Sequence, residues 1–167
     1  VFANGKGGAG KSLTACTLAA EWARRGLRVL LADADPQGTC EAWAAVAQEL
    51  ERDFRVSVMG VGDSLRTSLP AAARSFDVTL VDTAGKQSRR LAGALMVCDQ
   101  VIIPTAAGAS DLWALGATLD TIAQARELRD FDAAMLINNR PHTALGANLR
   151  ASLAATDLPV LRSELGN

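Results

Sequence analysis

The stretch that decides the fold is Gly5-Lys6-Gly7-Gly8-Ala9-Gly10-Lys11-Ser12, residues 5–12 of the chain. It satisfies the pattern G-x-x-x-x-G-K-[ST], in which glycines let successive backbone N–H groups point into one concavity that suits phosphate oxygens. Residues 1–4 precede it as a predicted strand, and residues 12–25 follow it as a predicted helix whose positive end faces the same anion. The pattern in this setting predicts a loop, here called the phosphate loop, that holds the phosphates of a nucleotide.

The side chains of the phosphate loop indicate how the nucleotide is held. We expect Lys11 to reach the β- and γ-phosphates and the Ser12 hydroxyl to ligate Mg²⁺. Lys6 is unusual, because a second lysine is not needed to hold phosphate within one subunit, and a solvated loop lysine is the alternative. The residues expected to contact nucleotide here are Gly5, Lys6, Gly7, Gly8, Ala9, Gly10, Lys11, Ser12 and Leu13.

Outward from the loop, short apolar runs alternate with longer alanine-rich helical runs. The predicted strands are residues 1–4, 28–33, 55–59, 77–82, 101–104, 133–138 and 159–161. The predicted helices are residues 12–25, 39–50, 63–74 (with Asp63 as cap), 89–97, 111–129 and 143–155. This alternation predicts an α/β fold with a doubly wound, mainly parallel seven-stranded sheet and helices on both faces. Ligands of such sheets bind at the carboxyl ends of the strands.

The composition excludes several classes of protein. The 167 residues are 49% apolar and 21% charged. This balance is typical of one globular domain, here spanning residues 1–167. The formal net charge of −1 excludes a molecule-wide basic field for nucleic acid, so such binding needs a local patch. His142 is the only histidine, which excludes HExxH zinc chemistry. Three cysteines without a CxxC pair indicate reduced thiols rather than a metal site.

Carboxylates follow two of the predicted buried strands. Asp33 and Asp35 lie two residues apart, so both lean to one face of the extended chain, and Asp82 ends a later strand. Near a triphosphate, such carboxylates hold Mg²⁺ through water or orient the attacking water. For Asp33 and Asp35, a helix cap or turn before Pro36 is the alternative.

Four segments resemble one known family. Residues 6–12, KGGAGKS, resemble the deviant Walker A motif of the ParA/MinD superfamily of P-loop ATPases. Residues 33–38, DADPQG, resemble the DxDPQG segment of plasmid and chromosome partition ATPases. Residues 76–85 are similar to their Walker B strand and residues 101–104 to the strand that follows it. The small ParA (ParF-like) partition type is the most similar, and its members continue through further C-terminal helices.

The resemblance assigns roles to individual residues. It implies that Lys6 crosses a dimer interface to the partner's nucleotide, so that Lys6, Lys11 and Asp35 are the catalytic residues. It implies that Asp33 lies close to a Mg²⁺ that Ser12 and Asp82 also hold. A strand-ending asparagine suits the N6 and N7 edge of adenine, and the resemblance favours Asn139. The chain has no NKxD motif, which favours ATP over GTP.

The resemblance also implies a function with ATP and Mg²⁺ as cofactors. It implies slow ATP hydrolysis without a stimulating partner, an ATP-dependent homodimer, non-specific DNA binding by that dimer, and a ParB-like centromere-binding activator. The expected location is cytoplasmic and nucleoid-associated, with no membrane partner. One alternative is a MinD-like ATPase that positions itself on a membrane or a protein assembly. Others are a small-molecule kinase, or an iron–sulfur carrier ATPase, for which the single Cys98 does not supply the expected pair.

Overall fold

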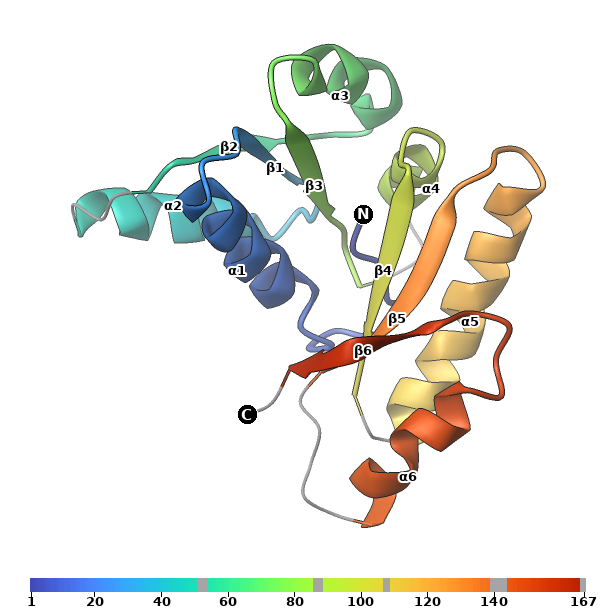
Figure 1. Ribbon diagram of the computed structural model, residues 1–167. Coiled ribbons are helices and arrows are strands. Elements are labelled where there is room, and N and C mark those ends of the chain that lie inside the picture. The colour runs from blue at the N-terminus through green and yellow to red at the C-terminus, as the bar shows by residue number, and fades with distance from the viewer. Residues whose placement is uncertain (51–53, 86–88, 107–108, 139–143, 166–167) are drawn as a thin grey trace.

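The computed structural model describes residues 1–50, 54–85, 89–106, 109–138 and 144–165, and of residues 109–112 and 144–148 it describes the backbone alone (Figure 1). Helices and strands alternate along the chain. The helices are α1 (Lys11–Arg24), α2 (Thr39–Glu49), α3 (Leu65–Ala73), α4 (Arg89–Leu95), α5 (Ala109–Arg126) and α6 (Ala144–Leu153). The strands are β1 (Val29–Asp33), β2 (Val56–Gly60), β3 (Val78–Asp82), β4 (Gln100–Thr105), β5 (Asp132–Asn138) and β6 (Val160–Leu165).

The strands form two parallel three-stranded units, β2-β1-β3 and β4-β5-β6. Phe2 joins the units through parallel bridges to Asp82 and Ile102, with its N–H donating to Val81 O at 2.9 Å. The predicted parallel α/β fold is therefore confirmed. The first of the seven predicted strands contributes a bridge rather than a regular strand, because the chain soon turns into the phosphate loop.

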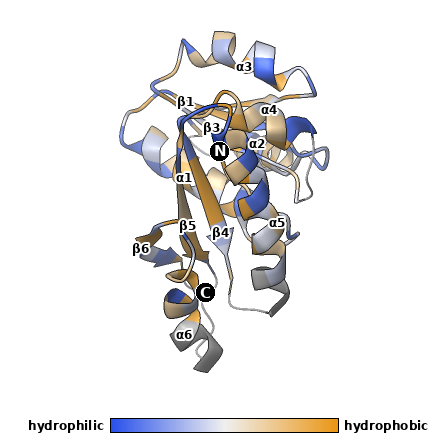
Figure 2. Ribbon diagram, turned by 90° about the vertical axis from the view of Figure 1, so that its right-hand side faces the viewer, coloured by the Kyte–Doolittle hydropathy of each residue, from blue (hydrophilic) through white to orange (hydrophobic). Residues whose placement is uncertain are grey.

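Apolar strands lie between two helical layers. All five residues of β1 are buried, as expected for a parallel strand covered on both faces. Leu31 packs in a cluster with residues of α1 and α2, whereas Leu30 packs in a cluster with α3 and α4. A third cluster joins α4, α5 and α6 to β4 and β5. In Figure 2, β4 and β5 are hydrophobic over most of their length. Helices therefore lie on both faces of the sheet, α1 and α2 on one and α3 to α6 on the other.

The α1 face of the sheet carries a hollow of about 990 Å³ beside α1. Its apolar lining comes from α1 and from strands on both sides of the bridge, and includes Trp22, Val78, Ile102, Leu136 and Leu161. Within the described residues, this face is covered by fewer helices than the opposite one.

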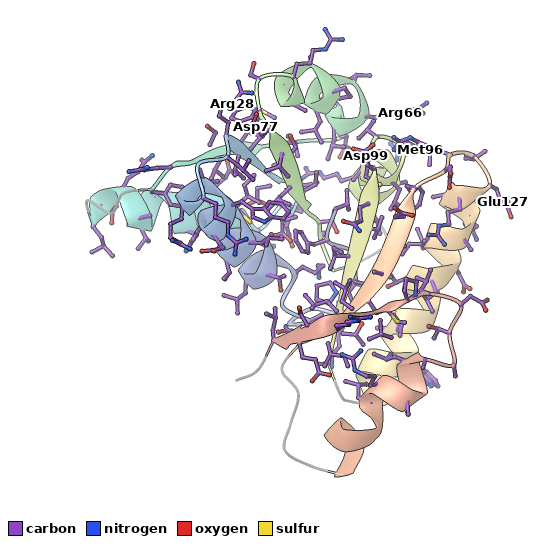
Figure 3. The ribbon with its side chains drawn as sticks, in the orientation of Figure 1. Arg28, Arg66, Asp77, Met96, Asp99 and Glu127 are labelled. Carbon is purple, nitrogen blue, oxygen red and sulfur yellow. The ribbon has the colours of Figure 1, made fainter. Side chains whose placement is uncertain are left out.

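The amino ends of β1 and β3 are joined at the edge opposite the phosphate loop. Arg28 Nη2 lies 2.6 Å from Asp77 Oδ1, and the Arg28 N–H donates to Asp77 Oδ2 at 2.8 Å (Figure 3). These contacts hold the pKa of the Asp77 carboxyl down at about 2. The predicted cap Asp63 differs from the structure: Ser64 precedes α3, and Asp63 instead pairs with Arg90 of α4 at 3.1 Å.

Candidate functional site

The phosphate loop follows Phe2 and runs directly into α1. Gly8 and Gly10 adopt φ values of 77° and 85°. Both values lie in the left-handed region that glycine tolerates best. The loop is also held from outside, since Gly5 N–H donates to Thr118 Oγ1 of α5 at 2.9 Å and Lys6 N–H donates to Asn4 Oδ1 at 2.9 Å. The loop is therefore fixed in shape by the protein alone, at the carboxyl edge of the sheet where ligands bind.

Lys11 is buried at the base of the loop. The residue is 6% exposed, and Nζ donates to Lys6 O at 3.2 Å. Burial lowers the pKa of Lys11, and the charges of Asp82 and Asp35 act in the opposite direction. A partly desolvated ammonium has lost favourable interactions with water. An approaching phosphate replaces those interactions and therefore stabilises the charged form of Lys11.

Asp82 ends β3 in a fully buried position. Its Oδ2 accepts a hydrogen bond from the Cys40 thiol at 3.4 Å, and its Oδ1 has no hydrogen-bond partner among the described residues. Burial raises the pKa of the Asp82 carboxyl, while hydrogen bonds from Ser12 and Cys40 act to lower it. A buried carboxylate oxygen without a partner, close to a hydroxyl, is suited to a divalent cation and its bound water.

Asp33 and Asp35 take different positions on the turn after β1. Asp33 is 2% exposed, and its oxygens accept backbone N–H groups of Asp35 at 3.1 Å, Cys40 at 2.8 Å and Glu41 at 3.2 Å. It therefore serves as the turn and helix cap that the sequence left as an alternative, and it fixes the start of α2. Asp35 is half-buried and accepts Gln37 N–H at 3.0 Å. The Asp35 charge acts on Lys11.

The structure also identifies residues that position the loop, a role that sequence reasoning did not assign to them. Asn138, at the end of β5, donates its side-chain amide to Ala9 O at 2.9 Å. Gly85 packs on the loop, since a Cβ there would lie 3.2 Å from Gly7 N. Asn4 donates to Pro104 O at 2.7 Å while it accepts from Lys6. Asn138, Gly85 and Asn4 therefore support the loop from three separate segments of the chain. Asn139, which was predicted to contact adenine, lies outside the described residues.

These residues fit a nucleotide with a divalent cation. The loop offers backbone donors, and Lys11 offers an ammonium that donates to Lys6 O. Ser12 and the orphaned Asp82 oxygen offer oxygen ligands of the kind that Mg²⁺ prefers. Leu13, included among the predicted contacts, is 71% exposed.

A model of the CobQ/CobB/MinD/ParA nucleotide-binding domain matches residues 1–165. The chain belongs to this family. The ParA/MinD resemblance of the loop is thereby confirmed, and the CobQ/CobB/MinD/ParA domain accounts for nearly the whole chain.

Among proteins of the CobQ/CobB/MinD/ParA family, this chain is 31% identical to the maintenance of carboxysome distribution protein A of Halothiobacillus neapolitanus, over 98% of this chain and 76% of that protein. It is 32% identical to the protein ParA of Rhizobium radiobacter, over 78% of this chain and 58% of that protein. A third relative, the chromosome partitioning protein ParA of Caulobacter vibrioides, is 38% identical over 56% of this chain. The chain spans between 40% and 76% of the length of these three relatives.

Solved structures share the fold. Cobyrinic acid a,c-diamide synthase from Mycobacterium smegmatis, with a bound ATP analogue and magnesium, superimposes with a TM-score of 0.85 at 20% identity, over 98% of this chain and 84% of that one. A putative plasmid partition protein from Borrelia burgdorferi bound to AMPPNP gives a TM-score of 0.77 at 20% identity, over 98% of this chain and 85% of that one. The family domain therefore has the architecture described above.

Two residues named in the sequence analysis, Asn139 and His142, lie outside the described residues. Three arginines in the C-terminal part of the described chain have partners within the chain. Arg126 donates to Phe131 O, Arg129 contacts Cys98 O and Asp99, and Arg150 Nη2 lies 2.8 Å from Glu164 Oε1. Over the described ranges, no helix of this family domain has the length and apolar character needed to cross a bilayer.

Proposed function

We propose that this chain is a ParA-type ATPase of plasmid or chromosome partition, in which bound ATP switches two copies into a dimer. The observation that carries the proposal is the pair of lysines in one phosphate loop. Lys11 is buried and donates to Lys6 O, whereas Lys6 is half-buried and its backbone N–H donates to Asn4 Oδ1. In this proposal Lys11 binds the nucleotide of its own subunit, and Lys6 reaches the nucleotide of a facing copy.

The chain's own residues divide the chemistry among them. Ser12 and Asp82 would hold the cation, with Asp33 fixing the neighbouring turn, and the bound Mg²⁺ would neutralise part of the phosphate charge. Lys11 and the partner copy's Lys6 would stabilise the charge that develops on the transferred phosphoryl group. Asp35, half-buried and within electrostatic range of Lys11, would orient the attacking water.

Nucleotide state would then set the association state. Loss of the γ-phosphate removes the group that both copies contact, so the dimer opens, as in other switches in which phosphate contacts order an interface. In this proposal the ATP dimer binds DNA without sequence preference, a ParB-like centromere-binding protein stimulates hydrolysis, and the protein works in the cytoplasm on the nucleoid. The named ParA relatives support this role.

The test measures ATP turnover and DNA retention together. We expect slow hydrolysis by the chain alone, and retention of duplex DNA with a non-hydrolysable ATP analogue but not with ADP. The Lys11→Ala variant, which lacks the buried ammonium, is the control and should show neither. Retention that is equal with ADP and with the analogue, or liposome binding in place of DNA binding, would contradict the partition proposal.

A second candidate is the positioning of a protein assembly, and one observation favours it. The relative that matches 98% of this chain is a carboxysome distribution protein, at 31% identity. The two candidates share the switch and differ in cargo. Deletion of the gene in its host separates them: replicon loss supports partition, whereas clustering of an assembly with all replicons retained supports positioning.

A further inference from the structure

One residue contacts both buried carboxylates of the candidate site. The backbone N–H of Cys40 donates to Asp33 Oδ2 at 2.8 Å, and the Cys40 thiol donates to Asp82 Oδ2 at 3.4 Å. Asp33 and Asp82 occupy paired positions at the ends of β1 and β3. We propose that Cys40 is a positioning residue for the divalent cation, whose thiol holds Asp82 by one oxygen and leaves the other for the cation. This inference rests on the proposed function, because it assigns Asp82 to the cation.

The thiol of Cys40 is fixed in place by its neighbours. Cys40 is fully buried in the first turn of α2, in a cluster with Leu31 and Val56. Cys16 of α1 donates its own thiol hydrogen to Cys40 Sγ at 3.6 Å. The Cys40 sulfur therefore accepts from Cys16 and donates to Asp82. A thiol with an ordinary pKa of about 8.5 is protonated at neutral pH, so the hydrogen needed for this donation is present.

The contact with Cys40 limits the rotation of the Asp82 carboxylate. Oδ2 accepts the thiol hydrogen, and Oδ1 has no hydrogen-bond partner among the described residues. With one oxygen held, the other stays in one position before a cation arrives, which is how partners of metal ligands orient them. Losing such a partner lowers metal affinity by about 10- to 100-fold. A thiol is a weak donor, so we expect the lower end of this range.

The two contacts of Cys40 can be separated by substitution. Asp33 accepts only backbone N–H groups in this turn, those of Asp35, Cys40 and Glu41. A variant at Cys40 keeps its N–H, so the turn after β1 and the start of α2 retain their hydrogen bonds. The thiol contact with Asp82 is the one that a side-chain change removes, and its effect can be measured alone.

The test is the Mg²⁺ dependence of ADP binding to the full chain, measured with a fluorescent ADP derivative. Cys40→Ala should raise the Mg²⁺ concentration for half-maximal tightening by about 10-fold, with affinity in EDTA unchanged. Cys40→Ser keeps a donor and should lie closer to wild type. A packing role alone would change affinity with and without Mg²⁺ alike. It would also make Ser the worse replacement, because an unpartnered buried hydroxyl costs more than a methyl group.

Cys98→Ala is the matched control. Cys98 is the third buried cysteine and lies in a different core cluster, so this variant should bind ADP as wild type does at every Mg²⁺ concentration. Because the probe is ADP, the measurement needs neither hydrolysis nor a dimer. A chain that binds Mg²⁺ and ADP as expected but does not turn over ATP would contradict the proposed function and leave the role of Cys40 intact.

A second measurement needs no change at Cys40. The chain has three cysteines, so the Cys16→Ala/Cys98→Ala double variant leaves one S–H stretching band in the infrared spectrum, that of Cys40. We expect ADP with Mg²⁺ to shift this band and ADP with EDTA to leave it in place. Circular dichroism checks that each variant folds. An unchanged Mg²⁺ requirement in Cys40→Ala, greater impairment in Cys40→Ser than in Cys40→Ala, or a band that does not respond to Mg²⁺ would overturn the inference without affecting the ATPase proposal.

Discussion

The side-chain amide of Asn138 lies against the phosphate loop and donates to Ala9 O at 2.9 Å. The fit is close, because a Cβ added to the next loop residue, Gly10, would lie 2.0 Å from Asn138 Nδ2. The end of β5 and the beginning of α1 are thus joined by a contact that leaves no room for a side chain. The conformation of the loop depends on this packing as well as on its glycines.

The Gly10→Ala variant should be strongly destabilised. Gly10 has a φ of 85°, and a Cβ added there would displace Asn138. A φ in this region strains any residue other than glycine. We expect a loss of about 2 to 4 kcal/mol in the free energy of unfolding, as for overpacking combined with backbone strain. Gly7→Ala is the matched control, since its Cβ meets nothing within 4 Å. Gly7→Ala should lower the free energy of unfolding by less than about 1 kcal/mol. Urea unfolding of both variants without nucleotide measures the difference.

Asp82→Asn should stabilise the protein without ligand. The raised pKa of Asp82 means that the folded state binds a proton which the unfolded state releases above about pH 4, so wild-type stability falls as pH rises through that window. The variant lacks this penalty. We expect a gain of about 1 to 2 kcal/mol at pH 7, or roughly 2 to 8 °C in Tm, that disappears near pH 4. ATP turnover should be lost, because Asp82 is the proposed cation ligand.

Asp77→Asn is the matched control for Asp82→Asn, because the carboxyl of Asp77 changes folding stability with pH in the opposite direction. Arg28 holds the pKa of Asp77 at about 2, so the stability that Asp77 contributes is present above the unfolded pKa and is lost as pH falls toward 2. The variant should lower Tm slightly at neutral pH, since the pair is exposed. In thermal melts from pH 3 to 8, the two variants should therefore shift Tm in opposite directions near pH 7, and the shift of Asp82→Asn should vanish near pH 4. Shifts of the same sign would contradict the assignment.

Trp113 should contribute to the ATP dimer. Its side chain is 90% exposed on α5, next to Ala114, whose carbonyl lies against Gly5 of the phosphate loop. A large exposed aromatic residue beside the site is typical of an interface hot spot, for which truncation costs about 2 kcal/mol or more. We expect Trp113→Ala to weaken dimerisation with an ATP analogue by about 30-fold or more, with Tm unchanged, as measured by analytical ultracentrifugation.

Leu128→Ala is the control for the Trp113 prediction. Leu128 is 79% exposed and follows the carboxyl end of α5, a helix of 18 residues that separates it from the loop. Its truncation should leave the dimer unchanged. Equal weakening by both variants would indicate a general surface effect, and no effect of Trp113→Ala would remove the residue from the interface.

The parts of the site that sequence predicts are those encoded locally. Residues 5–12 carry their chemistry in consecutive positions, and the strand of β1 is recognisable because all its residues are apolar up to Asp33. The contact of Asn138 with Ala9 spans 129 positions, so no local pattern distinguishes Asn138 from Asn139. The pairing of Cys16 with Cys40 depends in the same way on how α1 and α2 pack together. Asp33 acts as a cap because α2 begins close to the end of β1, which spacing alone left open.

The central claim is that bound ATP joins two copies through Lys6 and that Asp35 ends this state by hydrolysis. Light scattering of wild type, Lys6→Ala and Asp35→Ala, each with ADP and with ATP, tests it most directly. We expect every sample with ADP to be monomeric, wild type to dimerise transiently with ATP, Asp35→Ala to remain dimeric, and Lys6→Ala to remain monomeric. Identical masses for all three proteins in both nucleotides would contradict the claim.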